Sequence, residues 1–223
     1  MQMNILISNI SRIRTKKIVD TETNEIKEIA LIETNTYDSA DDNIKDIKGV
    51  ITNEAPIKML IQQLCDSSND KLDYVFAVTS GLVKKEYENI KKTSYDVLQE
   101  NIKAFCGEKY FVPQFRDFDI TDEPNNDDVI KTVMELDEAL KDEIEKAQKK
   151  DAQINVYIES NGGIRYVLTM LLSICNALER EYNNFKIKQI FSMVFGDNPI
   201  KVLETKRIFD SMQVPTIVNE YLS

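Results

Sequence analysis

Short apolar runs alternate with longer amphipathic stretches along this 223-residue chain. The runs at 4–8, 74–78 and 154–158 have the length and continuous apolar character of strands buried on both faces of a parallel sheet. The stretches between them place apolar residues three or four positions apart, which is the period of helices with one buried face. Strands that alternate with helices indicate βαβ crossovers. We therefore predict an α/β fold, with a Rossmann-like, mostly parallel sheet, helices on both faces and a β-hairpin after the first strand.

Turn and capping residues divide this pattern into elements. A helix is predicted to open at 52–56, where a capping side chain precedes a proline in the first turn. The stretch 82–105 is predicted to be helical with an interruption near Thr93, and the acidic segment 37–48 is predicted to be a surface loop. The other predicted elements are hairpin arms at 12–19 and 26–34, an edge or bulged segment at 110–120 marked by Pro113, helices at 125–149 and 164–178, extended segments at 187–194 and 200–203, and a last helix beginning near Arg207.

Composition narrows the class of protein. Hydrophobic residues make up 42% of the chain and charged residues 30%, the balance of a globular protein. Cys65, Cys106 and Cys175 are odd in number and far apart, which predicts reduced core thiols rather than disulfides or a zinc site. No apolar run approaches the roughly 20 residues that span a bilayer, and residues 1–8 do not form a secretion signal. We therefore predict a soluble cytoplasmic protein without a membrane partner.

Charge and missing motifs exclude several chemistries. The formal net charge of −10 argues against binding to duplex nucleic acid, although Arg12, Arg14, Lys16 and Lys17 stand in a segment without acids, where a solvated hairpin strand is the simplest interpretation. The chain has no histidine, which rules out a Ser-His-Asp or Cys-His site and any histidine metal ligand. Neither a P-loop nor the Gly-x-Gly-x-x-Gly motif of dinucleotide binders is present. No cofactor, metal site or catalytic residue is predicted.

Three strand-to-helix corners are candidates for a ligand site, because ligands of open parallel sheets bind at the carboxyl ends of the strands. Hydroxyl groups in the second corner are also typical helix caps. The candidate ligand-binding residues are Ser8, Asn9, Ile10, Ser11 and Arg12 in the first corner, Thr79, Ser80 and Gly81 in the second, and Asn161, Gly162, Gly163, Ile164 and Arg165 in the third.

The third corner has the clearest chemistry. Gly162 and Gly163 let an anion approach main-chain N–H groups at the start of a helix. Arg165 stands in the first turn of that helix, where a cation opposes the helix dipole but can reach a phosphate or a base. The structural alternative is a tight turn whose arginine bonds a neighbouring loop.

The segment from Ile154 to Arg165, Ile-Asn-Val-Tyr-Ile-Glu-Ser-Asn-Gly-Gly-Ile-Arg, resembles the strand and Asp-x-Thr-His-Gly-x-Arg turn of CRISPR-associated Rossmann-fold (CARF) domains, the sensor domains of type III CRISPR ancillary proteins. Glu159, Asn161 and Gly162 stand where that family has Asp, Thr and His, whereas Gly163 and Arg165 match it. About seven residues resemble the family as a motif, and most of the chain resembles it as a pattern of elements.

This resemblance implies a homodimer whose paired corners bind a cyclic oligoadenylate, such as cyclic tetra- or hexa-adenylate, and regulate an attached effector. It also implies a sensing domain over 1–206, followed at 207–223 by a helix that leads toward an effector domain absent from this chain. The RNase effector of the family uses an Arg-x4-His motif, which a chain without histidine cannot contain. The helix after Arg165 supports a dimer independently, because Met170 and Ile174 lie opposite Val167 and Leu171, and a helix that is apolar on both sides needs cover on both sides.

Two rival interpretations remain open from the sequence. In the first, the chain is a ring nuclease, in which a ribose 2′-hydroxyl of the bound messenger attacks the neighbouring phosphate. In the second, the chain is a generic nucleotide-binding α/β module or a structural dimerisation domain.

Overall fold

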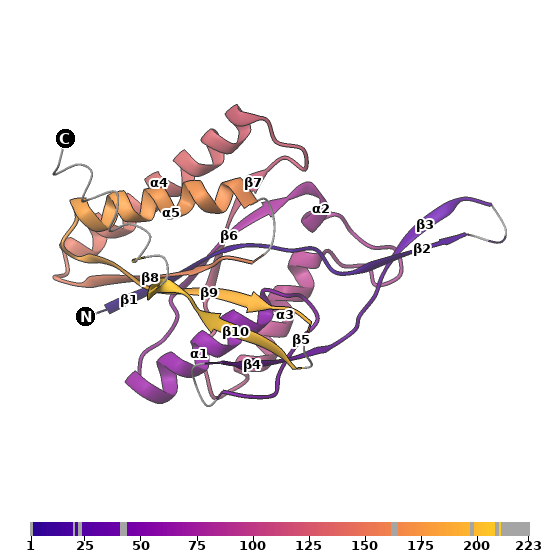
Figure 1. The fold of residues 1–223 in the computed structure, drawn as a ribbon, viewed down its shortest axis with the longest axis horizontal. Coiled ribbons are helices and arrows are strands. Elements are labelled where there is room, and N and C mark those ends of the chain that lie inside the picture. Colours follow the sequence, from indigo (N-terminus) through magenta and orange to yellow (C-terminus); the bar gives the residue numbers. More distant parts are fainter. Residues whose placement is uncertain are drawn as a thin grey trace.

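The computed structural model describes residues 2–19, 21, 24–40, 44–161, 165–196, 199–207 and 210, without the side chains of Arg165 and Tyr166. These residues form an eight-stranded sheet flanked by helices, together with a separate two-stranded hairpin (Figure 1). Across the large sheet the strands are β5 (Ile47–Gly49), β4 (Asn35–Ser39), β10 (Ile200–Glu204), β9 (Phe185–Val194), β8 (Gln153–Glu159), β1 (Gln2–Asn9), β6 (Tyr74–Ser80) and β7 (Gln114–Ile120).

The sheet is mostly parallel. From β9 through β8, β1 and β6 to β7, every neighbouring pair runs parallel. Beyond β9, strand β10 pairs antiparallel with β9 and parallel with β4, and β4 pairs antiparallel with β5. The α/β class, the mostly parallel sheet and the hairpin after the first strand are therefore confirmed.

Helices cover both faces of the sheet, as the continuous apolar strands require. The chain forms α1 (Glu54–Ser68), the short α2 (Gly81–Lys84), α3 (Ser94–Cys106), α4 (Asn126–Gln148) and α5 (Arg165–Glu181). Figure 1 shows α4 and α5 on one face and α1 and α3 on the other. Alternate residues of β1 serve the two cores, because Leu6 packs with the side of α1 while Ile5 and Ile7 pack with the side of α4 and α5.

The order of the connections creates a switch point in the sheet. From β1 the chain passes through α1 to β6 on one side, and through α2 and α3 to β7 at the edge. Helix α4 then returns the chain to β8, on the other side of β1, and α5 leads on to β9. Crossovers thus leave β1 and β8 in opposite directions, and open α/β sheets bind ligands in the crevice where this happens.

Two predicted elements need correction. Segment 37–48 is not a loop, because it contains the end of β4 and most of β5, and Tyr37 (1% exposed) and Ile47 anchor these strands in the core. The helical stretch predicted over 82–105 is interrupted near Thr93 as expected, but the interruption is much longer, since residues 85–93 separate α2 from α3. Between them Tyr87 and Lys92 form an isolated bridge, and α3 starts after a capping box of Thr93 with Asp96.

The predicted sheet edge and the predicted hairpin are confirmed. Strand β7 is the sheet edge expected from Pro113. The hairpin consists of β2 (Thr15–Val19) and β3 (Ile26–Ala30). All three cysteines are free thiols; Cys106 and Cys175 lie in the core as predicted, whereas Cys65 is half-buried. In the part of the chain that the structure describes, no helix combines the length and apolarity needed to cross a membrane. Lys206 is helical, but residues 211–223, where we predict that the helix continues, lie outside the described residues.

The second apolar side of α5 has cover within the chain. Met170 and Ile174 are half-buried and pack against the same core cluster as Val167 and Leu171. The side chain of Tyr166 lies outside the described part of the structure. Dimerisation therefore stays a prediction, and α5 gives less reason for it than the sequence pattern suggested.

Candidate functional site at the switch point

The ends of β1 and β8 form the centre of the candidate site. The parallel register places Ser8 beside Glu159, and both side chains are buried. The Ser8 hydroxyl donates a hydrogen bond to Oε2 of Glu159 at 2.9 Å. The first and third predicted corners, which are about 150 residues apart in the sequence, therefore meet at the switch point.

Asn53 joins these two corners to the start of α1. The sequence predicts a capping side chain here, but Asn53 makes no cap hydrogen bond to the helix. Its Nδ2 instead donates to Oε2 of Glu159 at 2.6 Å, to Oγ of Ser8 at 3.0 Å and to the carbonyl of Asn9 at 3.1 Å. Its Oδ1 accepts the backbone N–H of Ser11 at 2.8 Å. One buried amide thus holds the loop after β1 against the end of β8.

Glu159 is a buried carboxyl group surrounded by uncharged donors. Besides Ser8 and Asn53, the backbone N–H of Asn161 donates to its Oε1 at 2.8 Å. The side chain is 1% exposed, and burial raises the pKa of Glu159 from 4.5 to about 8 because the charged form loses its hydration. The hydrogen bonds from Ser8, Asn161 and Asn53 act in the opposite direction, but burial dominates. Glu159 therefore holds its proton at pH values where an exposed glutamate is ionised.

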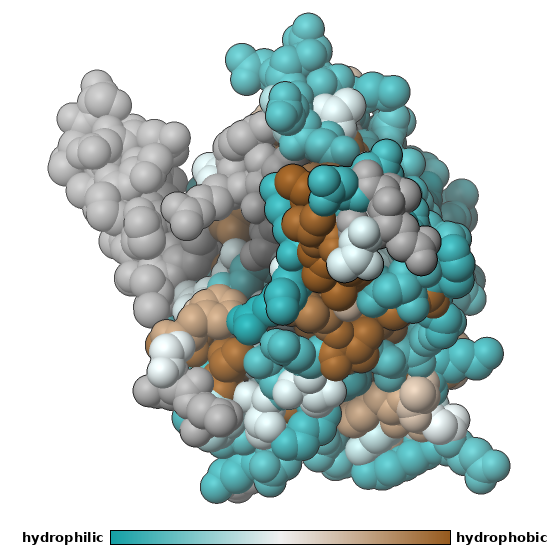
Figure 2. All heavy atoms as spheres, turned by 90° about the vertical axis from the view of Figure 1, so that its right-hand side faces the viewer, coloured by the Kyte–Doolittle hydropathy of each residue, from teal (hydrophilic) through white to brown (hydrophobic). Residues whose placement is uncertain are grey.

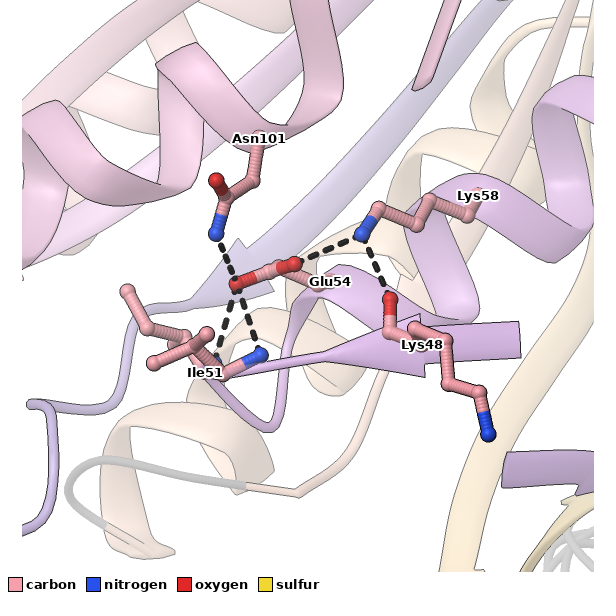
Figure 3. A network of polar contacts seen from close by, with 6 residues as sticks. Lys48, Ile51, Glu54, Lys58 and Asn101 are labelled. Atoms are coloured by element: carbon pink, nitrogen blue, oxygen red, sulfur yellow. Dashed lines mark hydrogen bonds and ion pairs between the residues drawn. The ribbon is translucent and has the colours of Figure 1, made fainter. Parts of the chain in front are cut away.

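A second buried network fixes the start of α1, next to Asn53 (Figure 3). Oε2 of Glu54 accepts a hydrogen bond from Nζ of Lys58 at 2.7 Å, and both side chains are buried. Three further contacts tie this ion pair to neighbouring segments: the Ile51 N–H donates to Glu54 at 3.0 Å, Nδ2 of Asn101 donates to Glu54 at 2.9 Å, and Lys58 donates to the Lys48 carbonyl at 2.6 Å. The pair therefore links β5, α1 and α3 directly beside Asn53.

The residues of the first predicted corner point both inward and outward. Ser8, Asn9 and Ile10 are buried, and the Ile10 N–H donates to the Val78 carbonyl of β6 at 2.9 Å. Ser11 is half-buried and Arg12 is exposed, with its guanidinium 3.5 Å from a Glu28 carboxylate oxygen. In this corner, Ser11 and Arg12 are therefore the side chains open to a ligand.

The second predicted corner lies one strand away, at the end of β6. Thr79 is buried and donates to Asp119 at 2.8 Å, and Ser80 precedes α2 without a side-chain cap bond. Packing explains why position 81 is a glycine, because a Cβ there would lie 2.7 Å from Oδ2 of Asp122. Oδ1 of the same Asp122 accepts the Leu82 N–H at 2.7 Å. These residues mainly join β6 to β7 and to the loop that follows it.

The third predicted corner is described only at its two ends. Asn161 is half-buried, and Arg165 begins α5, which confirms its place in the first turn. Gly162, Gly163 and Ile164 lie outside the described residues, as does the side chain of Arg165. Their roles in ligand binding therefore stay predictions.

Two surface pockets open at the carboxyl edge, and Gly81 is the candidate ligand-binding residue that lines one of them. One, of about 520 Å³, lies at the ends of β6 and β7 and is lined by Gly81, Lys84, Asp119, Ile120, Thr121, Asp122, Asp128, Lys131 and Thr132. The other, of about 420 Å³, includes Arg14, Phe195 and Gly196 and lies beyond the end of β9. The switch point lies between the strands that carry these pockets.

Sequence reasoning missed the central role of Asn53 and the Glu54–Lys58 pair. The signal for Glu159 was available, because it is a carboxyl group at the end of a largely apolar strand, where the ligand sites of open parallel sheets lie. The fold and this edge define a Rossmann-like α/β domain. No protein-family model matches the chain, and no curated protein matches it in sequence.

Proposed function

We propose that this chain is a cyclic oligoadenylate sensor domain of type III CRISPR defence, and that it binds the messenger at the switch point between β1 and β8. The supporting observation is the convergence there of the first corner, the start of α1 and the end of β8 through Asn53. The location is the one that open α/β sheets use for nucleotides. The resemblance of segment 154–165 to the CARF turn gives the ligand class.

The chemistry of the edge is compatible with a phosphate-rich ring. Arg12 and Arg14 are exposed beside the first corner, and the guanidinium of Arg12 lies 3.5 Å from a carboxylate oxygen of Glu28. Arg14, with the predicted contact of Arg165, would supply the positive charge for a phosphate on a chain with a net charge of −10. Buried Ser8, Asn53 and Glu159 support the corner from below. In a two-fold dimer each corner would occur twice, which suits a symmetric ring.

Calorimetric titration with cyclic tetra- and hexa-adenylate tests the proposal. At least one of the two ring sizes should bind to the parent chain. Arg165→Ala should weaken this binding by about 1.5–3 kcal/mol per contact, the range for hydrogen bonds to charged groups. Arg180→Ala is the matched control, because Arg180 stands in the last turn of the same helix, at the opposite end from the site. It should leave affinity unchanged.

Two results would contradict the sensor proposal in different ways. If neither ring binds, the sensor proposal fails and the generic module is favoured. If a ring binds and Arg165→Ala binds it as tightly as the parent, the assignment of the site to the third corner fails. If chromatography of the incubated mixture shows linear or shortened products, the chain is a ring nuclease. An intact ring after prolonged incubation supports a sensor without catalysis.

A further inference from the structure

The pocket of about 420 Å³ at the carboxyl edge lies beyond the end of β9, the strand next to β8. The first residues of β4 and β10 form its other sides. Figure 1 shows β9 ending on the right-hand side of the molecule, which faces the viewer in Figure 2, where apolar patches alternate with polar surface. The described residues that line the pocket are Arg14, Thr34, Asn35, Thr36, Phe195, Gly196 and Ile200.

Arg14 supplies this pocket with a positive charge, and none of the described lining residues is acidic. The neighbouring Arg12 differs, because its guanidinium lies 3.5 Å from a carboxylate oxygen of Glu28. Arg14 is exposed and forms no ion pair with another described residue. A guanidinium presents several N–H donors in a plane and binds phosphate through two oxygens at once. The pocket therefore offers a place for a phosphate group.

Phe195 supplies the same pocket with an aromatic ring. Strand β9 ends at Val194, and Gly196 then turns the chain with a φ of 122°, a conformation that residues with side chains rarely adopt. Phe195 is 55% exposed and belongs to neither core cluster. Single exposed apolar residues are common on protein surfaces, but an aromatic ring beside an arginine in a pocket offers a base a face for stacking.

Polar groups complete the pocket. Thr34, Asn35 and Thr36, at and just before the start of β4, contribute two hydroxyl groups and an amide. Such groups form hydrogen bonds with the edges of bases. The pocket volume lies within the range of small-molecule sites, roughly 300–1,000 Å³. The cation, the ring and the amide thus match the phosphate of a nucleotide, the face of its base and the edge of its base.

We propose that this pocket is a nucleotide subsite, in which Arg14 binds a phosphate and Phe195 stacks against the base. The identity of the base, adenine, rests on the proposed function. Arg14 follows Ser11 of the first corner by three residues, a distance of at most about 11 Å along the chain. A messenger held at the switch point therefore places one of its adenylate units in this pocket.

Three small probes separate the parts of the subsite. They are adenosine 5′-monophosphate, adenosine, which lacks the phosphate, and ribose 5-phosphate, which lacks the base. Each probe is titrated into the isotope-labelled chain and followed by the NMR signals of the backbone N–H groups. With adenosine 5′-monophosphate, the signals of Asn35 and Gly196 should shift, and these report on the pocket separately from Ser11 at the first corner.

Each substitution should affect only the probes that contain its binding partner. Phe195→Ala should weaken adenosine 5′-monophosphate and adenosine roughly 10-fold, the loss expected for one base–aromatic stack, and leave ribose 5-phosphate unchanged. Arg14→Ala should weaken adenosine 5′-monophosphate and ribose 5-phosphate roughly 10-fold, because it removes a charged hydrogen-bond donor, and leave adenosine unchanged.

Two further variants are controls. Phe195→Tyr keeps an aromatic ring and should keep the affinity of the parent for all three probes. Phe111→Ala should also leave every affinity unchanged, since Phe111 is 48% exposed but precedes β7, at the opposite edge of the sheet. A weaker binding of the probes by Phe111→Ala would show that loss of any exposed ring has this effect, and it would overturn the role of Phe195.

The results distinguish the subsite from the proposed function. The subsite is overturned if Asn35 and Gly196 do not shift, or if both alanine variants bind all probes as the parent does, and a ring that still binds then leaves the proposed function standing. If neither cyclic ring binds but the probe pattern holds, the proposed function fails and the pocket remains a site for a single nucleotide. Ring affinity that Phe195→Ala leaves unchanged would overturn the part of this pocket in messenger binding.

Discussion

Replacing Glu159 with glutamine should change how the stability of this protein depends on pH. Burial raises the pKa of Glu159 from 4.5 to about 8 in the folded state. Between these values the folded protein holds a proton that the unfolded chain has released. Because Glu159 holds its proton only in the folded state there, its contribution to the free energy of unfolding falls as pH rises from about 4.5 to about 8 and is level outside this window. Glutamine does not titrate, so Glu159→Gln should lack this loss.

The size of the effect follows from the shift. One pKa unit corresponds to 1.36 kcal/mol, so the contribution of Glu159 should decrease by on the order of 5 kcal/mol across the window. At acidic pH the variant should be about 1–2 kcal/mol less stable than the parent. In the parent, Oε2 of Glu159 accepts a hydrogen bond from Nδ2 of Asn53, whereas in the variant the N–H₂ of the new glutamine would face that donor. The order should reverse at about pH 6, once the loss of 1.36 kcal/mol per pH unit exceeds this difference. Above pH 8 the parent should be the less stable protein, since it then buries a carboxylate whose hydrogen-bond partners are uncharged.

Urea denaturation followed by circular dichroism from pH 4.5 to pH 9 measures this difference. The informative quantity is the parent value minus the variant value at each pH, because other titrating groups contribute equally to both. Glu143→Gln is the matched control, since Glu143 is also buried but pairs with Lys146 at 2.6 Å. It should leave the decline attributed to Glu159 in place. Parallel curves for the parent and Glu159→Gln would refute the reasoning, as would a difference that grows with pH.

Three further substitutions test the packing around the site, each by urea denaturation at neutral pH. Asn53→Ala should lower the free energy of unfolding by about 3 kcal/mol, because several buried groups lose their hydrogen-bond partner. Asn155→Ala is its control, since Asn155 bonds Asn4 at the other end of β8 and β1; it should cost less stability and leave messenger affinity unchanged. Lys58→Met should cost about 3–5 kcal/mol by leaving a buried carboxylate unpaired. Gly81→Ala should cost about 1 kcal/mol by displacing Asp122, and this cost should shrink in a variant that also carries Asp122→Ala. Equal stability of parent and variant would contradict each argument.

The sequence alone was sufficient to predict the elements that an apolar run or a nearby capping residue marks. The buried strands β1, β6 and β8 appear as apolar runs because both of their faces are covered by helices. The start of α3 near Thr93 follows from capping chemistry within four residues. Strands β4 and β5 gave no such signal. They are short and largely polar, and β4 becomes a strand by pairing with β10, about 160 residues later in the chain.

The candidate site shows the same division. The three corners could be identified from the sequence, because polar and glycine residues directly follow apolar strands. Their relative places could not, since strand order depends on which face each crossover helix covers. The hydrogen bonds from Asn53 to Ser8 and to Glu159 join residues that are 45 and 106 positions apart in the sequence. A local sequence motif is too short to include either pair. Packing also set the chemistry of Glu159, because its raised pKa comes from burial that only the assembled sheet and helices provide.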